Sequence, residues 1–581
     1  MKSNSMRLQR AALAGISASV LLAGIAAIVP AAQAADVTAQ RIINADKEPQ
    51  NWLTNNRDYN SDRYSPLKTI NTSNVKNLKL LYSVALNNAS PNYTEGTPLA
   101  EDGYLYLTDT WGMVYKIDAR SGTVGRIVWT MDPGQEAPSQ ANRGVALAGN
   151  IVVSIANGPP RLIGTNKDTG EELWEQNISA GEPHLEITGA PLFVNNEILV
   201  GAAGGDAGAR DWLAAFDAKT GKQLWKQYNV PAPGEKGSQT WADKINAWQT
   251  GGGAMYVTGS YDPKTNITYW GVGNPVPPYD PLVRPGDNLY TDSIMARNPD
   301  TGALAWTFQY TPNDGWDYDE SGTHILFDGK LGGKEQTLLT HSGRNGFLYT
   351  FAAQDGKFLK AEPYMNGINW TKGINPQTGK PLEYDPSKSE GHQTYAAAAA
   401  RSAGDLTKPA CPANVGGNNF WPSTLSGKTH MLYIPAITGC VTVTTNPAQH
   451  TAALGFGGGG YVVDQRLESD LVQADPVTGK IINRTHLKYP NYAGALSTGG
   501  GLVFTALEDG SVLAFDDKTL KQVWQFNTGV GFTAPPMTFS VGGKQYIAIT
   551  SGLSGSARGK LKMTPELSEQ RNAAMLYVFG L

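Results

Sequence analysis

Two short motifs of acidic and amide residues in the sequence could together hold a metal ion. Asn274 stands in the segment Gly-Val-Gly-Asn-Pro, and Asp317 and Asp319 stand in Trp-Asp-Tyr-Asp. Carboxylate and amide oxygens suit a hard cation that acts as a Lewis acid, and a neighbouring carboxylate can accept a proton. A single Asp after a Trp is usually a turn residue, so only the joint occurrence of these residues favours a catalytic site.

The elements that must position these residues come from an internal repeat. The repeat has a fixed order: a small residue, any residue, Asp or Asn, a few turn residues, Gly, three further residues and Trp. Each copy begins with an alternating strand, turns at the Asp or Asn and the Gly, and returns through a second strand. The Trp on that strand needs a neighbouring sheet to cover it. The copies span 118–129, 166–174, 217–225, 298–306, a degenerate 352–360, 475–483 and 516–524.

The spacing of the copies indicates the fold class. Repeats of about 40 to 50 residues are typical of propeller blades. One longer interval leaves room for another blade around 431–434, and a strand over 78–84 supplies a further edge. The sequence therefore predicts an all-β, eight-bladed β-propeller with tryptophan-docking repeats, a single domain over 35–581. Many such propellers are only scaffolds, so function has to be argued from the polar residues.

The composition agrees with a large all-β protein and excludes other classes. The 581 residues include 66 Gly and 14 Trp, and only 17% are charged, which argues against a coiled coil or a disordered chain. A net charge of −4 offers no basic face for nucleic acid. Two cysteines exclude a disulfide-dense scaffold, and without Cys-x-x-Cys-His the chain carries no covalently attached haem.

The first 34 residues have the pattern of a secretory signal peptide. Lys2, Arg7 and Arg10 precede the apolar run 11–29, and Ala-Gln-Ala at 32–34 gives a small-x-small cleavage pattern. An uncleaved membrane anchor is the alternative. Cleavage leaves 44 basic and 51 acidic residues, a net charge of −7. No later segment has the apolar length needed to span a bilayer, so we expect a soluble, exported, periplasmic protein without membrane insertion.

Further segments complete a family resemblance. Besides the two motifs and the repeats, the chain contains Asn51-Trp52 and Tyr64-Ser65-Pro66-Leu67. Together these segments resemble the pyrroloquinoline-quinone (PQQ) dependent alcohol dehydrogenases, with methanol dehydrogenase large subunits and quinoprotein ethanol dehydrogenases as the nearest types. The likeness runs from about Asn51 to the end of the chain. It implies an eight-bladed propeller with PQQ and one metal ion near its axis.

The resemblance also implies roles for individual residues. Asp317 matches the catalytic base, and Asn274 matches a metal ligand. Arg143 takes the position of an arginine that holds a quinone carboxylate. Arg344 takes the position of a cation beside the quinone oxygens. The other expected PQQ contacts are Glu95, Thr188, Gly204, Gly205 and Asn419.

The chain departs from the family pattern around the expected quinone. The family usually has two adjacent cysteines over the cofactor, where this chain has Ala137 and Pro138. The aromatic floor, normally Trp, is Tyr256, which can still stack on a planar ring. A later Trp-Gly pair is Tyr492-Ala493, so Tyr492 is the expected contact there. We therefore expect a ceiling that is built differently and is more open.

The expected metal ligands leave the identity of the ion open. Asp206 replaces the glutamate of the family and is one methylene shorter. Asp319 occupies a position that is an aspartate in lanthanide-using relatives and a small neutral residue in calcium-using ones. The metal set is then Asp206, Asn274, Asp317 and Asp319, with either calcium or a lanthanide. Asp319 as a solvated turn residue is the alternative.

The resemblance also bears on the cysteines and on electron transfer. The family has a structural disulfide at positions that match Cys411 and Cys440, and an oxidising periplasm favours the bridge. Free buried thiols are the alternative. Because the chain lacks a haem motif, we expect it to pass electrons to a separate soluble acceptor such as a cytochrome c.

Three functions compete at this stage. The first is a periplasmic PQQ- and metal-dependent alcohol dehydrogenase, whose substrate we expect to be a bulky primary or secondary alcohol. The polar segment 367–405, with its alanine run 396–400, and the missing cysteine pair suggest the larger substrate. The second is a non-enzymatic binding or assembly scaffold, and the third is a metal-dependent hydrolase. Retention of Arg143, Asn274, Asp317 and Arg344 favours the first. The sequence does not predict the oligomeric state.

Overall fold

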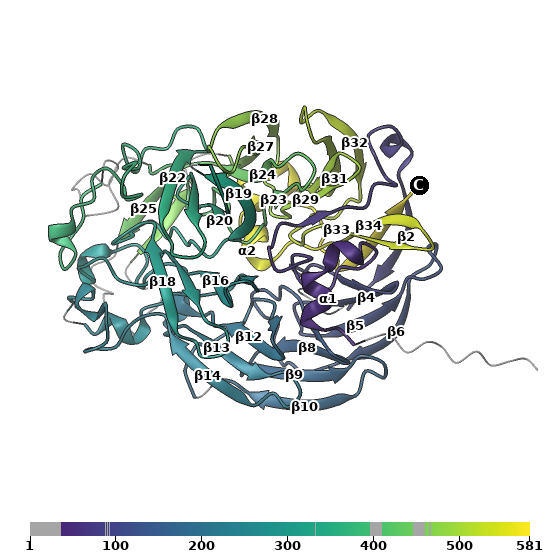
Figure 1. Ribbon diagram of the computed structural model, residues 1–581, viewed down its shortest axis with the longest axis horizontal. Helices are drawn as coiled ribbons and strands as arrows, with labels where there is room; N and C mark the ends of the chain where they lie inside the picture. Colours follow the sequence, from purple (N-terminus) through teal and green to yellow (C-terminus); the bar gives the residue numbers. More distant parts are fainter. Residues whose placement is uncertain are drawn as a thin grey trace, which may run out of the picture. The chain divides into compact units, whose positions relative to one another are not determined.

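The computed structural model describes residues 36–581 except 88, 90, 92, 180, 244, 332, 396–408, 446–458 and 464–465. The predicted signal peptide at 1–34 and the alanine run at 396–400 therefore lie outside the described residues. Residues Ala35–Leu581 form one compact unit, built almost entirely of β-strands around a common centre (Figure 1).

Eight antiparallel sheets form the blades, which confirms the predicted eight-bladed propeller. Seven of them have four strands, and the seventh blade carries an additional parallel strand, β1 (Tyr64–Ser65), against β29. The strands of the first four blades are β3 (Leu99–Glu101), β4 (Tyr104–Thr108), β5 (Val114–Asp118) and β6 (Arg126–Met131); β7 (Ala146–Ala148), β8 (Ile151–Ala156), β9 (Arg161–Asn166) and β10 (Glu172–Asn177); β11 (Leu192–Val194), β12 (Glu197–Gly201), β13 (Trp212–Asp217) and β14 (Gln223–Tyr228); β15 (Ser260–Asp262), β16 (Ile267–Gly271), β17 (Ser293–Arg297) and β18 (Leu304–Gln309).

The remaining blades include the two that the repeat pattern left incomplete. The interval around 431–434 forms the sixth blade, and the strand expected at 78–84 is β2, the outer strand of the eighth. The strands are β19 (Ile325–Leu331), β20 (Lys334–Ser342), β21 (Phe347–Ala352) and β22 (Phe358–Pro363); β23 (Thr424–Leu425), β24 (Leu432–Thr438), β27 (Glu468–Ala474) and β28 (Ile481–Leu487); β29 (Ala495–Thr498), β30 (Leu502–Ala506), β31 (Ser511–Asp516) and β32 (Gln522–Asn527); β33 (Met537–Val541), β34 (Lys544–Thr550), β35 (Met575–Gly580) and β2 (Lys79–Ala85).

Tryptophans on the outer strands dock onto the next blade, as the repeat predicts. Trp225 of β14 covers Gly302, whose φ of +71° lies in the left-handed region, and a Cβ added there would lie 2.6 Å from the indole. The indole N–H of Trp225 also donates to the Pro299 carbonyl at 2.6 Å. Trp306 repeats the arrangement on Gly356 and donates to a carbonyl of that turn at 3.0 Å. These two turns therefore have to end in glycine because the indole of the preceding blade occupies the space of a side chain.

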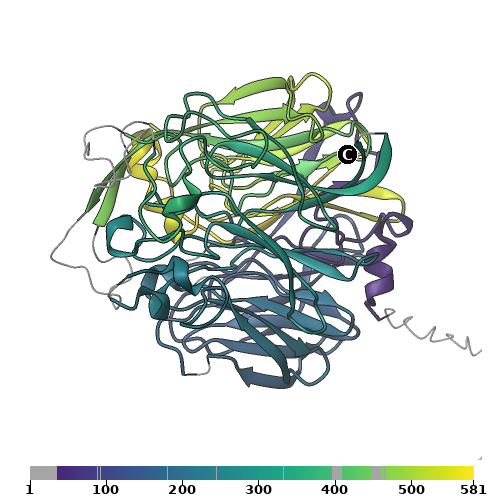
Figure 2. The same cartoon turned by 60° about the vertical axis from the view of Figure 1, so that its left-hand side comes forward.

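The loops between strands carry few other regular elements. A helix near the N-terminus, α1 (Ala39–Ile43), and another near the C-terminus, α2 (Gly555–Arg558), are both short. The sixth blade is interrupted by a hairpin of β25 (Val441–Thr445) and β26 (Gly459–Val463). This hairpin and α2, green and yellow in Figure 2, both contribute to the cavity described below. Within the described part of the chain, we find no helix that combines the length and apolar character of a membrane span.

Candidate active site

Loops from most of the blades converge on a cavity of about 640 Å³, a size suited to a cofactor with its substrate. Every predicted cofactor and metal residue except Tyr492 lines this cavity. Its lining includes Glu95, Arg143, Thr188, Gly204, Gly205, Asp206, Tyr256, Asn274, Asp317, Asp319, Arg344 and Asn419. The structure thus gathers residues that are scattered over more than three hundred positions of the sequence, while their individual roles stay predictions.

Asp317 lines the cavity, and one of its carboxylate oxygens is held by protein donors. Oδ2 accepts hydrogen bonds from the Tyr279 hydroxyl at 2.9 Å and from Nδ2 of Asn414 at 3.1 Å. Oδ1 is buried and has no hydrogen-bond partner among the described residues. The Asp314 carboxylate accepts backbone N–H groups of Asp317 and its two neighbours, which fixes a turn where Asp317 adopts a φ of +70°. An orphaned buried carboxylate oxygen of this kind calls for a cation or a proton donor.

Asp319 is held on both oxygens. The Arg344 guanidinium lies 3.0 Å from Oδ2, and the Asn274 backbone N–H donates to Oδ1 at 3.0 Å. The Tyr256 hydroxyl lies 2.9 Å from Oδ2 and 2.8 Å from Oδ1 of Asn419, so its single proton bridges this pair of acceptors. Burial raises the pKa of the Tyr256 phenol, which keeps it a donor. Asp319 is therefore a fixed part of the cavity wall and not a solvated turn residue.

Asp206 lies on a one-turn 3₁₀ helix, Gly205–Ala207, that glycines make possible. Gly204 has a φ of +106°, and a Cβ there would collide with the His184 carbonyl. Nδ2 of Asn274 donates to Oδ1 of Asp206 at 3.3 Å. Burial, followed by the charge of Asp319, raises the pKa of Asp206 to about 7. The glycines thus let a short acidic turn approach Asn274 closely.

The donor set fits a hard cation. Burial and the charges of Asp206 and Asp319 raise the pKa of Asp317 well above its usual range, so these carboxylates repel one another in a dry site. A bound cation would remove that repulsion, and Asn274 adds an amide oxygen of the kind such ions accept. In the described residues, no three acidic, histidine or cysteine side chains alone form a metal cage.

Arg143 lies between two aromatic rings at another part of the cavity. Its guanidinium carbon is 5.0 Å from the ring centre of Tyr256 and 4.9 Å from that of Phe420. The guanidinium forms an ion pair with Glu95 at 2.8 Å and donates to the Thr188 hydroxyl at 2.9 Å. These contacts bring three predicted PQQ contacts together, Glu95, Arg143 and Thr188, with Tyr256 beside them.

Tyr492 lies one layer behind the cavity wall. Its ring is buried and stacks on Phe420, with ring centres 6.2 Å apart and planes 12° from parallel. Among the described residues that line the cavity, Phe420 takes the place that the sequence analysis gave to Tyr492. Tyr492 therefore supports the wall without forming it.

The loop that carries Ala137 and Pro138 is held by a buried polar network. Nε2 of Gln135 donates to the carbonyl of Ala137 at 2.5 Å, and Nδ2 of Asn157 donates to the Ser139 hydroxyl at 2.9 Å. The backbone N–H of Asn157 donates to Oε1 of Gln135 at 2.8 Å. Hydrogen bonds therefore constrain this loop, which has no cysteine pair.

Arg344 is fixed from behind by a buried acid. Oε2 of Glu320 accepts the Arg344 backbone N–H at 3.2 Å and lies 2.8 Å from Nε2 of His341. The ring of His324 stacks on that of His341 with centres 4.0 Å apart. Both histidines are buried core residues.

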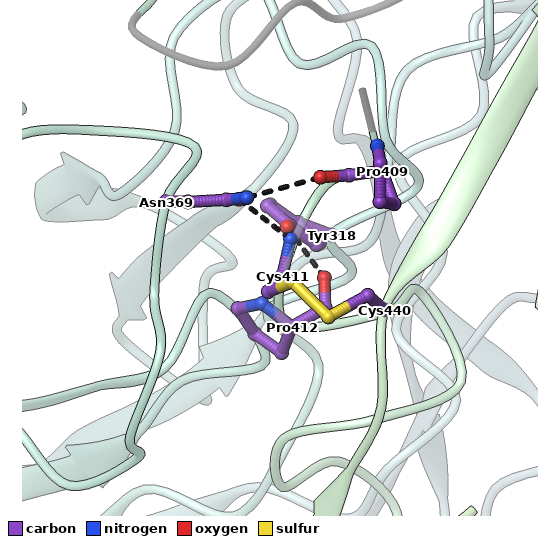
Figure 3. Close-up of a disulfide and its surroundings, with 6 residues drawn as sticks. All are labelled: Tyr318, Asn369, Pro409, Cys411, Pro412 and Cys440. Atoms are coloured by element: carbon purple, nitrogen blue, oxygen red, sulfur yellow. Dashed lines mark hydrogen bonds between the residues drawn. A yellow bond between two sulfur atoms is a disulfide. The ribbon is translucent and has the colours of Figure 1, made fainter. Parts of the chain in front are cut away.

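The two cysteines form the expected disulfide, Cys411–Cys440 (Figure 3). The bridge joins the start of β25 to the loop that leads to Asn414. The Tyr318 hydroxyl donates to the Pro412 carbonyl of that loop at 2.7 Å. The disulfide thereby anchors the segment whose Asn414 side chain holds Asp317.

Sequence reasoning missed several residues of the site. Tyr279 and Asn414 hold Asp317, Phe420 stacks on Arg143, and Lys560 follows α2 in the cavity wall. Phe420 directly follows Asn419, and Tyr279 lies five residues after Asn274 in a proline-rich loop. Proximity to predicted residues was the available signal for those two, and Lys560 had none.

Comparisons with known proteins identify the class of protein that this propeller and cavity define. Residues 52–361 and 469–547 match the family model described as glucose/ethanol/alcohol dehydrogenase, beta-propeller domain. The quinoprotein alcohol dehydrogenase PedH of Pseudomonas putida is 33% identical over 93% of this chain and 91% of its own length. The lanthanide-dependent methanol dehydrogenase of Methylacidiphilum fumariolicum is 32% identical over 88% of this chain and 86% of its own.

Solved structures agree with this family match. A europium-containing methanol dehydrogenase superposes with a TM-score of 0.83 at 30% identity, covering 93% of this chain and all of its own. The quinohemoprotein alcohol dehydrogenase of Comamonas testosteroni gives 0.81 at 30% identity, covering 94% of this chain and 82% of its own. The chain belongs to the PQQ-dependent alcohol dehydrogenases and is an oxidoreductase of that family, which sets aside the scaffold and hydrolase alternatives. Membership implies PQQ and a metal ion as cofactors.

Proposed function

We propose that the protein is a periplasmic alcohol dehydrogenase in which Asp317 is the catalytic base. The observation that carries this proposal is the arrangement of its carboxylate. Oδ2 is fixed by Tyr279 and Asn414, Oδ1 is buried without a hydrogen-bond partner among the described residues, and Asp317 belongs to the cavity lining. A carboxylate positioned in this way is ready to accept the proton of an alcohol hydroxyl.

The other residues divide the remaining tasks. Asp206, Asn274, Asp317 and Asp319 would hold the metal ion, and Arg143 and Arg344 would pair with carboxylate or carbonyl oxygens of the quinone. When bound, PQQ would supply the electrophilic carbon that accepts hydride. Asp317 takes the hydroxyl proton at Oδ1, and Arg344 keeps Asp319 in place through the 3.0 Å ion pair. The aromatic rings of Tyr256 and Phe420 exclude water from this part of the cavity.

We further propose that the ion is a lanthanide. Asp206 and Asp319 both form hydrogen bonds with Asn274, and their charges raise the pKa of Asp317, so a trivalent ion would offset more of this repulsion than calcium does. The expected outcome is that Asp319→Ala abolishes lanthanide-supported activity and spares calcium-supported activity. Metal affinity measured by titration calorimetry on the same variant gives a readout that does not depend on turnover. Equal loss with both ions would contradict the assignment.

The proposed substrate is a bulky primary or secondary alcohol, and the proposed acceptor is a soluble cytochrome c. The cavity volume of about 640 Å³ and the position of Ala137 outside its lining support room for a large substrate. The sequence contains no Cys-x-x-Cys-His, which supports a separate electron acceptor. A panel of small and bulky alcohols tests the first point, and reduction of purified cytochromes tests the second.

The experiment that tests the function is alcohol-dependent dye reduction after adding PQQ with calcium or a light lanthanide. Activity should need both additions. Asp317→Ala should lower kcat at least about 100-fold, as expected for loss of a general base, while PQQ still binds in titration. Asp328→Ala, an exposed carboxylate on β19 that pairs with Lys264, is the control and should behave as wild type. Near-wild-type rates for Asp317→Ala would remove this residue from the mechanism.

A further inference from the structure

Glu186 places a carboxylate in the cavity wall that the chemistry above does not use. The segment around it alternates between two faces. Leu185 and Ile187 are buried in the hydrophobic core, while Glu186 and Thr188, which alternate with them, line the cavity. The Thr188 hydroxyl accepts a hydrogen bond from Arg143 at 2.9 Å, so this face is turned toward the predicted cofactor contacts. The side chain of Glu186 therefore belongs to the active-site cavity by its place in the segment.

The backbone of this segment is held from two sides. Glu186 forms an antiparallel bridge with Ala203, with N–H to carbonyl bonds of 2.9 and 2.8 Å. The side-chain amide of Asn157 accepts the backbone N–H of Ile187 at 2.9 Å and donates to its carbonyl at 3.0 Å. Ala203 leads directly into the glycine turn that carries Asp206. The carboxylate of Glu186 is thus displayed on a fixed part of the wall, beside the segment of the proposed metal site.

The carboxylate of Glu186 lacks a partner of opposite charge. Among the described residues it forms no ion pair and no side-chain hydrogen bond. The two guanidinium groups of the lining are engaged elsewhere. Arg143 is paired with Glu95 at 2.8 Å, and Arg344 is paired with Asp319 at 3.0 Å. Burial raises the pKa of Glu186 without a cation to oppose it, so a positively charged ligand would offset the cost of this half-buried charge.

We propose that Glu186 forms an ammonium-binding subsite, so that the substrates include alcohols that carry a primary amine at the other end of the molecule. This inference rests on the proposed function and narrows its substrate class. Both Asp317, the proposed base, and Glu186 line the same cavity of about 640 Å³, so one ligand can present its hydroxyl to the first and its ammonium to the second. The ammonium donates a charge-assisted hydrogen bond to the carboxylate and takes part in no covalent step.

The test compares pairs of alcohols on the full-length mature protein loaded with PQQ and metal. Each pair is an ω-amino alcohol and the 1-alkanol that has a methyl group in place of the ammonium, in a series of increasing chain length. The measured quantity is kcat/KM. Glu186→Gln keeps the shape of the side chain and removes its charge. Glu172→Gln is the matched control, because Glu172 is exposed on β10 and lies outside the cavity lining. Thermal melting checks that each variant is folded.

At the chain length that fits best, Glu186→Gln should lower kcat/KM for the amino alcohol at least about tenfold and leave the alkanol unchanged, as expected for a hydrogen bond between charged groups. The subsite is overturned if both members of the pair lose equally, if neither changes, if the wild type oxidises only the alkanols, or if Glu172→Gln has the same effect.

A second measurement separates the subsite from the proposed function. If the wild type oxidises no alcohol of either kind, the proposed function is refuted. Calorimetric titration with a 1-alkylammonium salt, which has no hydroxyl to oxidise, still tests Glu186. The salt should bind the wild type at least about tenfold more tightly than Glu186→Gln, and equal affinities would overturn the subsite.

Discussion

The hydrogen bond from Tyr279 to Asp317 offers a direct test of how the predicted base is tuned. Tyr279→Phe removes one hydroxyl and leaves the ring in place. The variant loses the 2.9 Å bond to Oδ2 and also the 3.2 Å bond that the Tyr279 hydroxyl accepts from Nδ2 of Asn414, whose 3.1 Å bond to Oδ2 remains. The Phe variant therefore removes one of the two side-chain donors to Oδ2 of Asp317.

The size of the effect follows from the type of bond. A hydrogen bond to a charged group contributes roughly 1.5 to 3 kcal/mol, and about 1.4 kcal/mol equals one pKa unit. Since Asn414 still donates to Oδ2, we expect the lower end of this energy range. Loss of a donor disfavours the carboxylate, so the pKa of Asp317 should rise by about one unit. The base is active when ionised, so activity should be lost at a pH about one unit higher than in the wild type.

The assay is the pH dependence of kcat in the enzyme loaded with PQQ and metal. The acidic limb of the Tyr279→Phe profile should lie about one pH unit above that of the wild type. At pH values above this limb, kcat should approach the wild-type value. Tyr59→Phe is the matched control, because that buried hydroxyl donates to the Phe193 carbonyl and Tyr59 is outside the described cavity lining. An unshifted limb in folded Tyr279→Phe, or an equal shift in the control, would refute the reasoning.

Three further predictions concern the metal, the blade contacts and the disulfide. Metal affinity should rise as the pH climbs through about 7, because Asp206 must lose its proton, and calorimetry in two buffers should detect proton release. Gly302→Ala should lower the free energy of unfolding by about 2 kcal/mol or more. The new Cβ would clash with Trp225, and alanine would also have to adopt a left-handed backbone conformation. Gly529→Ala, with a φ of +76° and open space, should show the backbone cost alone in the same urea titration. Reduction of the disulfide, which closes a 29-residue separation, should cost about 3 to 4 kcal/mol, and an unchanged denaturation midpoint would contradict this.

The blades were predictable because each repeat is a local unit. Asp516, for example, accepts the backbone N–H groups of Lys518 and Thr519 and so sets a turn from neighbouring residues alone. A further turn of this kind, 375–379, escaped notice because its partner is Phe358 and not a tryptophan. The hairpin of β25 and β26 also escaped notice, because it interrupts a blade and carries no repeat signal.

The site was predictable only where the family motifs reached. Asp317 and Asp319 stand in such a motif, whereas Asn414 comes near Asp317 through the fold and the disulfide loop. The exchange of Tyr492 for Phe420 in the lining depends on which of two stacked rings lies in front. A linear pattern contains no information on that order, because both rings are aromatic and both are near Trp421.

The pairing of β2 with β35 constrains the order in which the protein can fold. Lys79 near the start of the chain lies opposite Gly580 at its end. Synthesis delivers β2 well before its partner β35, so the ring cannot close until β35 has been made. Until then the outer edge of β34 lacks its neighbour, and such an edge invites pairing with other molecules. A chain that is truncated by even its final strand should therefore be a candidate for aggregation and not a slightly smaller enzyme.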